Sequence, residues 1–263
     1  MARLDIELVN RNLIETRAKA QEAIKSGLIY CNNKCITKNS FQVDENDVLT
    51  IKGELLKYVS RGGLKLEKAI SSFNIDLKNK IMCDIGSSTG GFSDCAIQNG
   101  VKEIFAIDVG SNQFDSKLRN LENIYLYENT DFRSMDINLL ENVNLVTIDV
   151  SFISVIKLIN KIAMLPNCTE IVCLVKPQFE CGKEIADKYK GVIINKNVHY
   201  DVINNLISEF KKIGFNTNGL AHSPIKGGSG NIEYLLYLRK DTLNVIDESI
   251  IQEVINKAFK NNF

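Results

Sequence analysis

Four charged side chains in this sequence occupy positions that are typical of catalytic groups. Asp149 and Lys176 each follow an apolar run that predicts a buried strand. Lys65 follows a Gly-Gly-Leu segment at the predicted start of a helix, and Glu233 lies inside an otherwise apolar predicted strand. Because a buried charge is costly unless it is paired, we expect the two lysines and the two carboxylates to pair with one another at one site.

Such a set of side chains suits the removal of a proton from a weakly acidic hydroxyl group. A lysine can act as the general base when burial and a neighbouring cation lower its pKa. Asp149 and Glu233 would then hold the lysines in place and keep the second lysine charged. Lys176 is our first candidate for the base, and Lys65 is a competing candidate.

A glycine-rich turn opens a helix directly after the apolar run 81–85. The turn and its flanks comprise Asp84, Gly86, Ser87, Ser88, Thr89, Gly90, Gly91 and Phe92. The turn lacks the Gly-Lys-Ser/Thr ending of a phosphate-binding P-loop, and its glycine spacing does not match the Gly-x-Gly-x-x-Gly of dinucleotide-binding folds. The order Asp-x-Gly-x-x-x-Gly-Gly instead resembles motif one of S-adenosylmethionine-dependent methyltransferases.

Acidic residues near this turn suit a cationic ligand and would repel a pyrophosphate group. Asp108 closes the next predicted strand, where it is placed to bind ribose hydroxyl groups, and Asp131 is placed to meet an adenine. We therefore expect the cofactor S-adenosylmethionine to bind at this turn. A glycine turn with a purely structural role is the alternative.

The elements that must position these residues alternate between strand and helix along most of the chain. Apolar runs that predict strands lie at 81–85, 104–107, 124–127, 145–150 and 171–175, with Asp149 ending the strand of the fourth run, and predicted helices include 153–163 and 199–213. Such alternation is typical of an α/β fold with a mostly parallel, Rossmann-like sheet that is covered on both faces.

The end of the chain follows a different pattern. The predicted strands 217–221 and 232–238 are joined only by a short glycine-rich link, so we expect an antiparallel hairpin at the edge of the sheet. A last amphipathic segment contains Ile246, Ile250, Val254 and Phe259, which predict a helix packed on the sheet.

The first sixty residues predict a separate small unit of two helices and a hairpin. Thr16 is a candidate N-cap of a helix that runs to about Lys25, and Gly27 ends that helix. The first forty residues carry seven Lys or Arg against four Asp or Glu, whereas the whole chain carries 32 of each class. A local basic face suits a phosphate backbone, and a solvated helix face is the alternative. We expect the domain boundary between residues 1–59 and 60–263.

Several long motifs resemble one family of enzymes. They lie at 58–66, 84–92, 147–154, 175–180 and 230–234. Lys65, Asp149, Lys176 and Glu233 match in order the Lys-Asp-Lys-Glu tetrad of the FtsJ-like ribose methyltransferases. The chain is thereby similar to the TlyA family, also named haemolysin A, and its N-terminal part resembles the RNA-binding module of ribosomal small-subunit protein S-four.

The resemblance implies a class I methyltransferase domain behind a small α+β RNA-binding domain. The implied reaction is 2′-O-methylation of cytidine in ribosomal RNA of the small subunit, the large subunit or both, with S-adenosylmethionine as the cofactor. The implied partner is ribosomal RNA or a ribosomal subunit. The expected RNA contacts of the N-terminal module are Arg3, Arg11, Arg17 and Lys19.

The target base must leave its stack to bring the ribose hydroxyl group to the methyl donor. Phe152 and Phe179 lie beside the catalytic strand ends and are candidates for stacking on that base. For each of them, packing in the core is the alternative.

Composition bears on the other functions that we considered. No apolar run approaches the roughly 18–20 residues that cross a bilayer, which weakens the alternative of a membrane-active haemolysin.

Seven cysteines in a chain of 263 residues predict free thiols, a reducing compartment and hence the cytoplasm. We expect no metal site, because Cys31 and Cys35 have no second pair at ligand spacing. A catalytically silent RNA-binding protein is a further alternative, which the intact tetrad disfavours.

Overall fold

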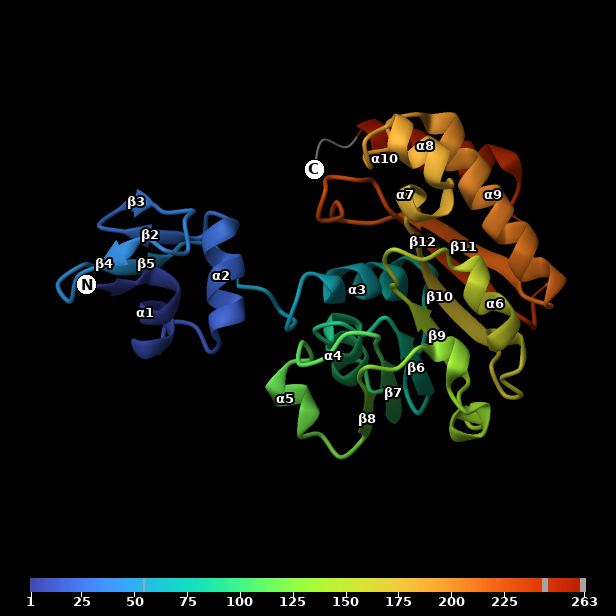
Figure 1. Cartoon of the computed structure of the whole chain (residues 1–263), viewed down its shortest axis with the longest axis horizontal. Coiled ribbons are helices and arrows are strands. Elements are labelled where there is room, and N and C mark those ends of the chain that lie inside the picture. The colour runs from blue at the N-terminus through green and yellow to red at the C-terminus, as the bar shows by residue number, and fades with distance from the viewer. Residues whose placement is uncertain (54, 243–245, 261–263) are drawn as a thin grey trace. The chain divides into compact units, whose positions relative to one another are not determined.

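The computed structural model describes residues 1–53, 55–242 and 246–260 (Figure 1). The chain divides into two compact units, Met1–Arg61 and Gly62–Phe263. Each unit has its own cluster of buried hydrophobic side chains, so each can be understood from its own sequence.

The N-terminal unit combines two helices with short antiparallel strands. Its elements are β1 (Ala2–Arg3), α1 (Leu4–Asn10), α2 (Arg17–Lys25), β2 (Ile29–Cys31), β3 (Lys34–Cys35), β4 (Gln42–Val43) and β5 (Leu49–Ile51). The Thr16 side chain accepts a hydrogen bond from the Lys19 amide at 3.3 Å, as expected of an N-cap. Gly27 follows the helix with a φ of +71°, a left-handed conformation that suits glycine.

The second unit is built on a seven-stranded sheet in the order β11-β12-β10-β9-β6-β7-β8. The strands are β6 (Ile81–Ile85), β7 (Glu103–Ile107), β8 (Ile124–Tyr127), β9 (Leu145–Ile148), β10 (Glu170–Val175), β11 (Asn216–His222) and β12 (Tyr234–Arg239). The first five of these in chain order are parallel to one another, whereas β12 is antiparallel to both β10 and β11. The predicted Rossmann-like sheet with an antiparallel hairpin at one edge is confirmed.

Helices cover both faces of this sheet (Figure 1). They are α3 (Gly62–Phe73), α4 (Gly91–Gln98), α5 (Ser116–Arg119), α6 (Ile156–Ala163), α7 (Pro177–Glu180), α8 (Lys183–Lys188), α9 (Lys196–Lys212) and α10 (Glu248–Lys260). Alternate residues of the central strands form one core cluster with α6, α9 and α10. On the other face, α3 places Phe73 on Tyr237 of β12, with ring centroids 5.7 Å apart.

One helix near the predicted site begins later than predicted. Strand β9 ends at Ile148 and Asp149 directly follows it, as expected, whereas α6 begins at Ile156 and not at residue 153. Between them Phe152 has a φ of +65°, a left-handed conformation that neither a strand nor an α-helix contains. The chain therefore forms a loop that extends over the first three residues of the predicted helix.

The position of Glu233 also differs from the prediction. It directly precedes β12 and does not lie inside a strand, because the pairing of β12 with β10 ends at the pair Val175↔Tyr234. Since β12 is antiparallel to β10, its first residues lie at the end of the sheet where β10 finishes. Glu233 therefore lies next to the residue that follows β10.

Candidate active site

Three strands and one helix bring the predicted catalytic residues to one edge of the sheet. Asp149 directly follows β9, Lys176 directly follows β10, and Glu233 directly precedes the antiparallel β12. The first turn of α3 contributes Lys65. Residues that are far apart in the sequence are thus gathered at the carboxyl ends of the parallel strands, where ligands bind in open α/β sheets.

The four side chains form one continuous series of ion pairs. Lys65 Nζ lies 2.7 Å from Glu233 Oε2 and 3.9 Å from Asp149 Oδ2. Lys176 Nζ lies 2.6 Å from Asp149 Oδ1 and donates a hydrogen bond to Ser151 Oγ at 2.9 Å. Asp149 therefore stands between the two ammonium groups, so one carboxylate orients both lysines.

Three of the four side chains are almost completely buried. The exposed fraction is 8% for Lys65, 7% for Lys176 and 3% for Glu233. Removing one member of such a buried network leaves a charge without its partner, which typically costs about 3–5 kcal/mol. The lysines also differ in their partners, because Lys65 contacts two carboxylates and Lys176 contacts one carboxylate and one hydroxyl group.

A cavity of about 660 Å³ opens beside Asp149 at this edge of the sheet. Four residues predicted to bind the cofactor line it, namely Gly86, Ser88, Asp108 and Asp131. Gly86 has a φ of +84°, and a Cβ there would lie 2.6 Å from the carbonyl oxygen of Asp149. Only glycine can therefore occupy this point, at which the cofactor loop touches the catalytic strand end.

The remaining predicted cofactor residues do not line this cavity. They are Asp84, Ser87, Thr89, Gly90, Gly91 and Phe92. Gly90 has a φ of +88°, and a Cβ there would meet side-chain atoms of Leu118 and Phe114 at 2.6 and 2.9 Å. The absence of a side chain at Gly90 is thus explained by packing within the protein, and a direct role in cofactor binding stays a prediction.

Asp84 lies beneath the glycine loop and is fully buried. Its carboxylate accepts hydrogen bonds from Ser93 Oγ at 2.7 Å and from Thr147 Oγ1 at 2.8 Å. Burial raises the pKa of Asp84 to about 6, although these two donors oppose the shift. The Asp84 side chain therefore stabilises the glycine loop through its hydrogen bonds with Ser93 and Thr147, and it has no exposed surface that could contact a ligand.

This raised pKa predicts a pH effect on stability. Asp84 binds its proton more tightly in the folded state than in the unfolded state, where the pKa is near 3.8. Its contribution to stability is therefore full below about pH 4 and is lost as the pH rises to about 6. Compared with Asp84→Asn, the wild-type protein should lose up to about 3 kcal/mol of unfolding free energy across this range. Urea unfolding of both proteins at pH 4, 5, 6 and 7 measures the difference, and parallel pH curves would contradict the assignment.

The two other acidic residues of the predicted cofactor site are held by different partners. Asp108 accepts hydrogen bonds from the amides of Ser88 at 2.8 Å and Gly110 at 2.7 Å, so it ties the glycine loop to the segment after β7. Asp131 forms an ion pair with Arg133. The hydrogen bonds from Arg133 are the main cause of the lowered pKa of the Asp131 carboxyl group. Both carboxylates remain at the cavity wall.

The two candidate stacking residues lie together beside the tetrad. Phe152 is 92% exposed and lines the cavity, which excludes the core-packing alternative for it. Its ring centroid lies 5.1 Å from that of Phe179, and Lys176 Nζ lies 5.9 Å from the centroid of the Phe179 ring. An aromatic side chain this exposed is available to contact a substrate.

The cavity fits S-adenosylmethionine in size. Its volume lies within the range of about 300–1,000 Å³ that is usual for small-molecule sites. Its wall contains three carboxylates, from Asp108, Asp131 and Asp149, and two cationic side chains, from Arg133 and Lys157. Gly86 lets the backbone approach that ligand without a side chain between them.

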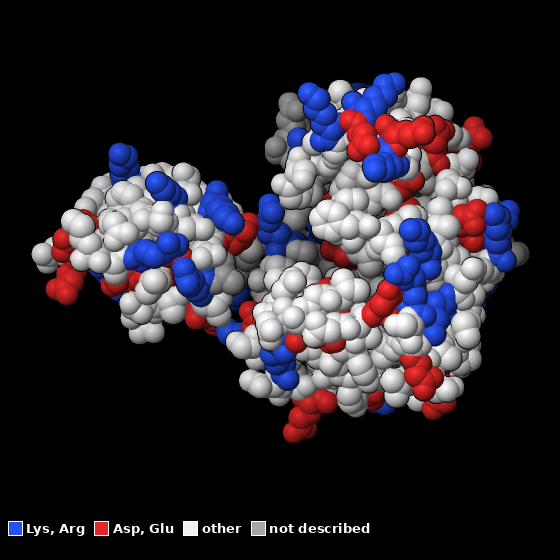
Figure 2. Space-filling view, in the orientation of Figure 1, with Lys and Arg blue, Asp and Glu red and all other residues white. Residues whose placement is uncertain are grey.

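The expected RNA contacts of the N-terminal unit each have a partner within the unit. Arg3 and Arg17 both bind Asp5, which is fully buried and whose pKa is held well below its usual value chiefly by the Arg3 hydrogen bond. Lys19 pairs with Glu15. Arg11 binds Glu7 and the carbonyl oxygens of Asp44 and Asp47, so its head group serves the fold. Figure 2 shows basic side chains spread across the visible face of this unit.

Sequence reasoning missed several residues of the site. The cavity is also lined by Gly110, Gln113, Thr130, Arg133, Ser151 and Lys157. Gly227 packs against the catalytic carboxylate, because a Cβ there would lie 2.4 Å from Glu233 Oε1. The run Lys226-Gly227-Gly228-Ser229-Gly230 was interpreted only as a hairpin link, and its closeness in sequence to Glu233 was the available signal.

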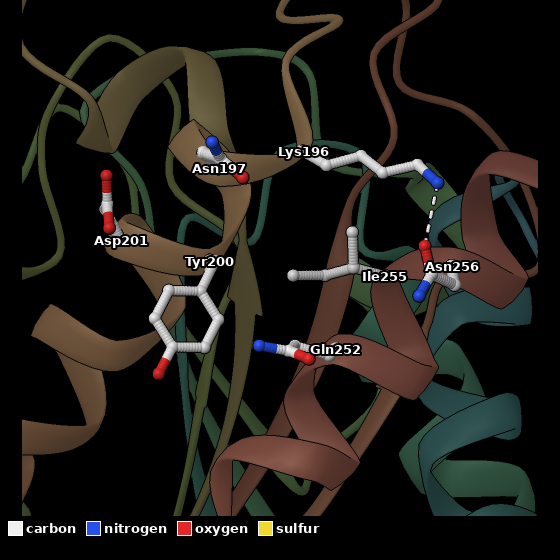
Figure 3. Close-up of a pocket in the computed structure, with 7 residues that line it drawn as sticks. All are labelled: Lys196, Asn197, Tyr200, Asp201, Gln252, Ile255 and Asn256. Atoms are coloured by element: carbon white, nitrogen blue, oxygen red, sulfur yellow. Dashed lines mark hydrogen bonds between the residues drawn. The ribbon is translucent and has the colours of Figure 1, made fainter.

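A second pocket, of about 530 Å³, lies between α9 and α10 and is separate from the tetrad (Figure 3). Lys196 reaches across it and donates to Asn256 Oδ1 at 2.7 Å. The pocket contains no catalytic residue of the tetrad. Across residues 1–53, 55–242 and 246–260, no helix has both the length and the apolar character needed to span a bilayer.

Comparison with known proteins identifies two family models in the chain. The model of the FtsJ-like methyltransferases matches residues 58–240, and the model of the S4 domain matches residues 2–49. The first match includes all four tetrad residues and the whole glycine loop. The S4 match lies within the first compact unit, and the FtsJ-like match covers most of the second.

Individual relatives are similar over most of the chain. A Bacillus subtilis protein provisionally named rRNA methyltransferase YqxC is 48% identical over 240 residues, which are 90% of this chain and 85% of that protein. The 16S/23S rRNA (cytidine-2′-O)-methyltransferase TlyA of Mycobacterium tuberculosis is 32% identical over 263 residues, covering 98% of this chain and 97% of the relative. A solved Streptococcus thermophilus structure, provisionally named a hemolysin, is 38% identical with a TM-score of 0.78, covering 98% of this chain and 95% of that one.

Proposed function

Because the chain belongs to the FtsJ-like methyltransferase family and is similar over nearly its full length to TlyA, we propose that it methylates the 2′-hydroxyl group of cytidine in ribosomal RNA. The observation that carries this proposal is the series of ion pairs Glu233–Lys65–Asp149–Lys176, of which Asp149 lines the cavity. When bound, S-adenosylmethionine supplies a methyl group on a positively charged sulfur atom. Gly86, Ser88, Asp108 and Asp131 would hold it.

Lys176 is the general base in the proposed reaction. In its neutral form it accepts the proton of the ribose hydroxyl group, while Asp149 and Ser151 orient its amine. The contacts favour Lys176 over Lys65, because removing the proton of Lys65 would leave two carboxylates without their shared cation. Lys65 stays charged and keeps Asp149 and Glu233 in place.

Phe152 is the proposed contact for the unstacked target base. Stacking of a base on an aromatic side chain is typically worth about 1–3 kcal/mol and tolerates any base. Phe152 has the exposure and the position beside Asp149 that this role needs. Selection of cytidine must then come from hydrogen bonds to the edge of the base.

The direct test of this function is to locate the methyl group. Purified protein should transfer labelled methyl groups from S-adenosylmethionine to ribosomal subunits, and mass spectrometry should find 2′-O-methylcytidine in the 16S or the 23S rRNA. The same nucleotide should lack the methyl group in cells without this protein. Cofactor binding without any transfer would favour the catalytically silent RNA-binding alternative, and lysis of liposomes by the purified protein would favour the haemolysin alternative.

The N-terminal unit is expected to provide most of the affinity for RNA. Removing residues 1–59 should weaken binding to ribosomal subunits about a hundredfold or more, because the cationic contacts to phosphate groups are lost. Binding of S-adenosylmethionine should change little, since the cavity residues all lie within 85–158. Filter binding at several salt concentrations and calorimetry with the cofactor measure the two effects. An unchanged affinity for the subunits would mean that the basic unit has another role.

A further inference from the structure

Phe152 lies in residues 151–155, which connect Asp149 to the first turn of α6. This segment is held in place by residues 176–180. Of residues 176–180, only Lys176 takes part in the proposed chemistry. Phe152 has a left-handed φ of +65°, a conformation that typically costs a residue with a side chain about 1–3 kcal/mol. Such a conformation persists only when neighbouring contacts hold it.

Residues 176–180 make these contacts in a regular series. Lys176 donates to Ser151 Oγ at 2.9 Å, and Phe179 packs on Phe152 with ring centroids 5.1 Å apart. Glu180 then accepts two hydrogen bonds, from Ser154 Oγ at 2.6 Å and from the Val155 amide at 2.8 Å. The two segments are thus joined at three successive points.

The Glu180 carboxylate has the strongest hold on the segment. It stands at the N-terminus of α6, where a negative charge is favourable and where amide groups lack partners within the helix. Ser154 Oγ accepts a hydrogen bond from the Ile156 amide at 3.2 Å, and Glu180 satisfies the preceding amide, that of Val155. Glu180 therefore completes the cap of α6 and binds two of the three residues that follow the strained position.

We propose that Glu180 is a positioning residue that fixes residues 151–155 through Ser154 and Val155 and so keeps Phe152 exposed beside Lys176. Glu180 does not contact a reacting atom, and it acts through the segment that it binds. The inference deepens the proposed RNA methylation and rests on it for the role of Phe152. Its structural part, the ordering of the segment, can be measured without RNA.

The absence of tryptophan from the sequence provides a direct probe of that ordering. Phe152→Trp places a single indole at the position in question. Adding Glu180→Ala should lower the fluorescence anisotropy of this indole, because the segment loses both hydrogen bonds to the carboxylate. Ser154→Ala removes one of these two hydrogen bonds, together with the one that Ser154 Oγ accepts from the Ile156 amide, and leaves the bond between Glu180 and the Val155 amide. It should lower the anisotropy in the same direction. Unchanged anisotropy in both double variants would overturn the proposal.

Glu170 provides a matched control. Glu170 is a buried glutamate at the start of β10, the end of that strand away from Lys176, where it binds Lys80 and accepts from Tyr237 OH at 2.8 Å. Glu170→Ala should lower the melting temperature without changing the anisotropy of the indole. An equal loss of anisotropy in Glu170→Ala would mean that general loosening of the fold explains the result.

Kinetics then connects the segment to the reaction. In the otherwise wild-type protein, Glu180→Ala should raise the KM for ribosomal RNA about tenfold, within the range expected for loss of one base stack, while the affinity for S-adenosylmethionine stays constant. Glu180→Gln keeps an acceptor for the Val155 amide and should recover most of the loss. Equal kinetics in Glu180→Gln and Glu180→Ala would contradict a role through these hydrogen bonds.

If the anisotropy falls as expected but the wild-type protein methylates no RNA, the proposed function is wrong and the ordering role of Glu180 remains.

Discussion

Lys176→Met should lower the rate of methyl transfer by about a thousandfold or more, which is within the usual range for loss of a general base. The amine that receives the hydroxyl proton is removed, whereas the cavity wall, which does not include Lys176, stays in place. Single-turnover transfer of a labelled methyl group to ribosomal subunits measures the loss. Calorimetry with S-adenosylmethionine should give an affinity close to that of the wild-type protein.

Lys176→Arg separates two explanations of this loss. Arginine keeps the positive charge beside Asp149 but cannot give up its proton near neutral pH. If Lys176 is the base, Lys176→Arg should be as inactive as Lys176→Met. Substantial activity in the arginine variant would mean that the charge alone is required, and Lys65 would then become the candidate base.

Gly86→Ala should abolish cofactor binding and destabilise the protein. The added Cβ would lie 2.6 Å from the Asp149 carbonyl oxygen and 2.9 Å from its carbonyl carbon, both of which are backbone atoms. Because β9 is held in the centre of the sheet, the glycine loop must shift and the cavity must change shape. Thermal unfolding and calorimetry with S-adenosylmethionine measure the two consequences.

Gly214→Ala is the matched control for this substitution. Gly214 has a φ of +86°, almost the same as the +84° of Gly86, but a Cβ there would have no heavy atom within 4 Å. Its substitution should therefore cost only the conformational strain, about 1–2 kcal/mol, and leave cofactor binding intact. If both variants bind the cofactor like the wild-type protein, the close approach of Gly86 to Asp149 has no functional importance.

Much of the fold follows from local sequence patterns. The apolar runs and helical periodicities predicted the strands of the parallel sheet, the edge hairpin and the last helix, because these patterns reflect which face of an element is buried. Where a local pattern conflicted with a long-range contact, the prediction was wrong. The helix predicted from residue 153 begins at Ile156, since Ser154 and Val155 are held by Glu180 from another part of the chain.

The glycine loop illustrates the same limit within the site. The motif indicated eight residues around the turn as cofactor contacts, yet only Gly86 and Ser88 of that set line the cavity. Gly86 and Gly90 have nearly equal φ values but meet different neighbours, a backbone in one case and side chains of α5 and its approach in the other. A sequence motif predicts the backbone conformation of a loop. Which residues of that loop contact the ligand depends on the other parts of the protein that pack against the loop.

By itself, the sequence determined which groups are available for chemistry, namely two lysines, two carboxylates and a glycine turn, and it placed Asp149, Lys176 and the turn at the ends of strands. Only the tertiary structure decided their order of contact, with Asp149 between the lysines and Lys65 bound to Glu233 from 168 residues away. It also decided that Asp84 is buried and Phe152 is exposed. The reason is physical, since pairing and burial depend on which distant segments pack together, and the direction of β12 alone brings Glu233 to the site.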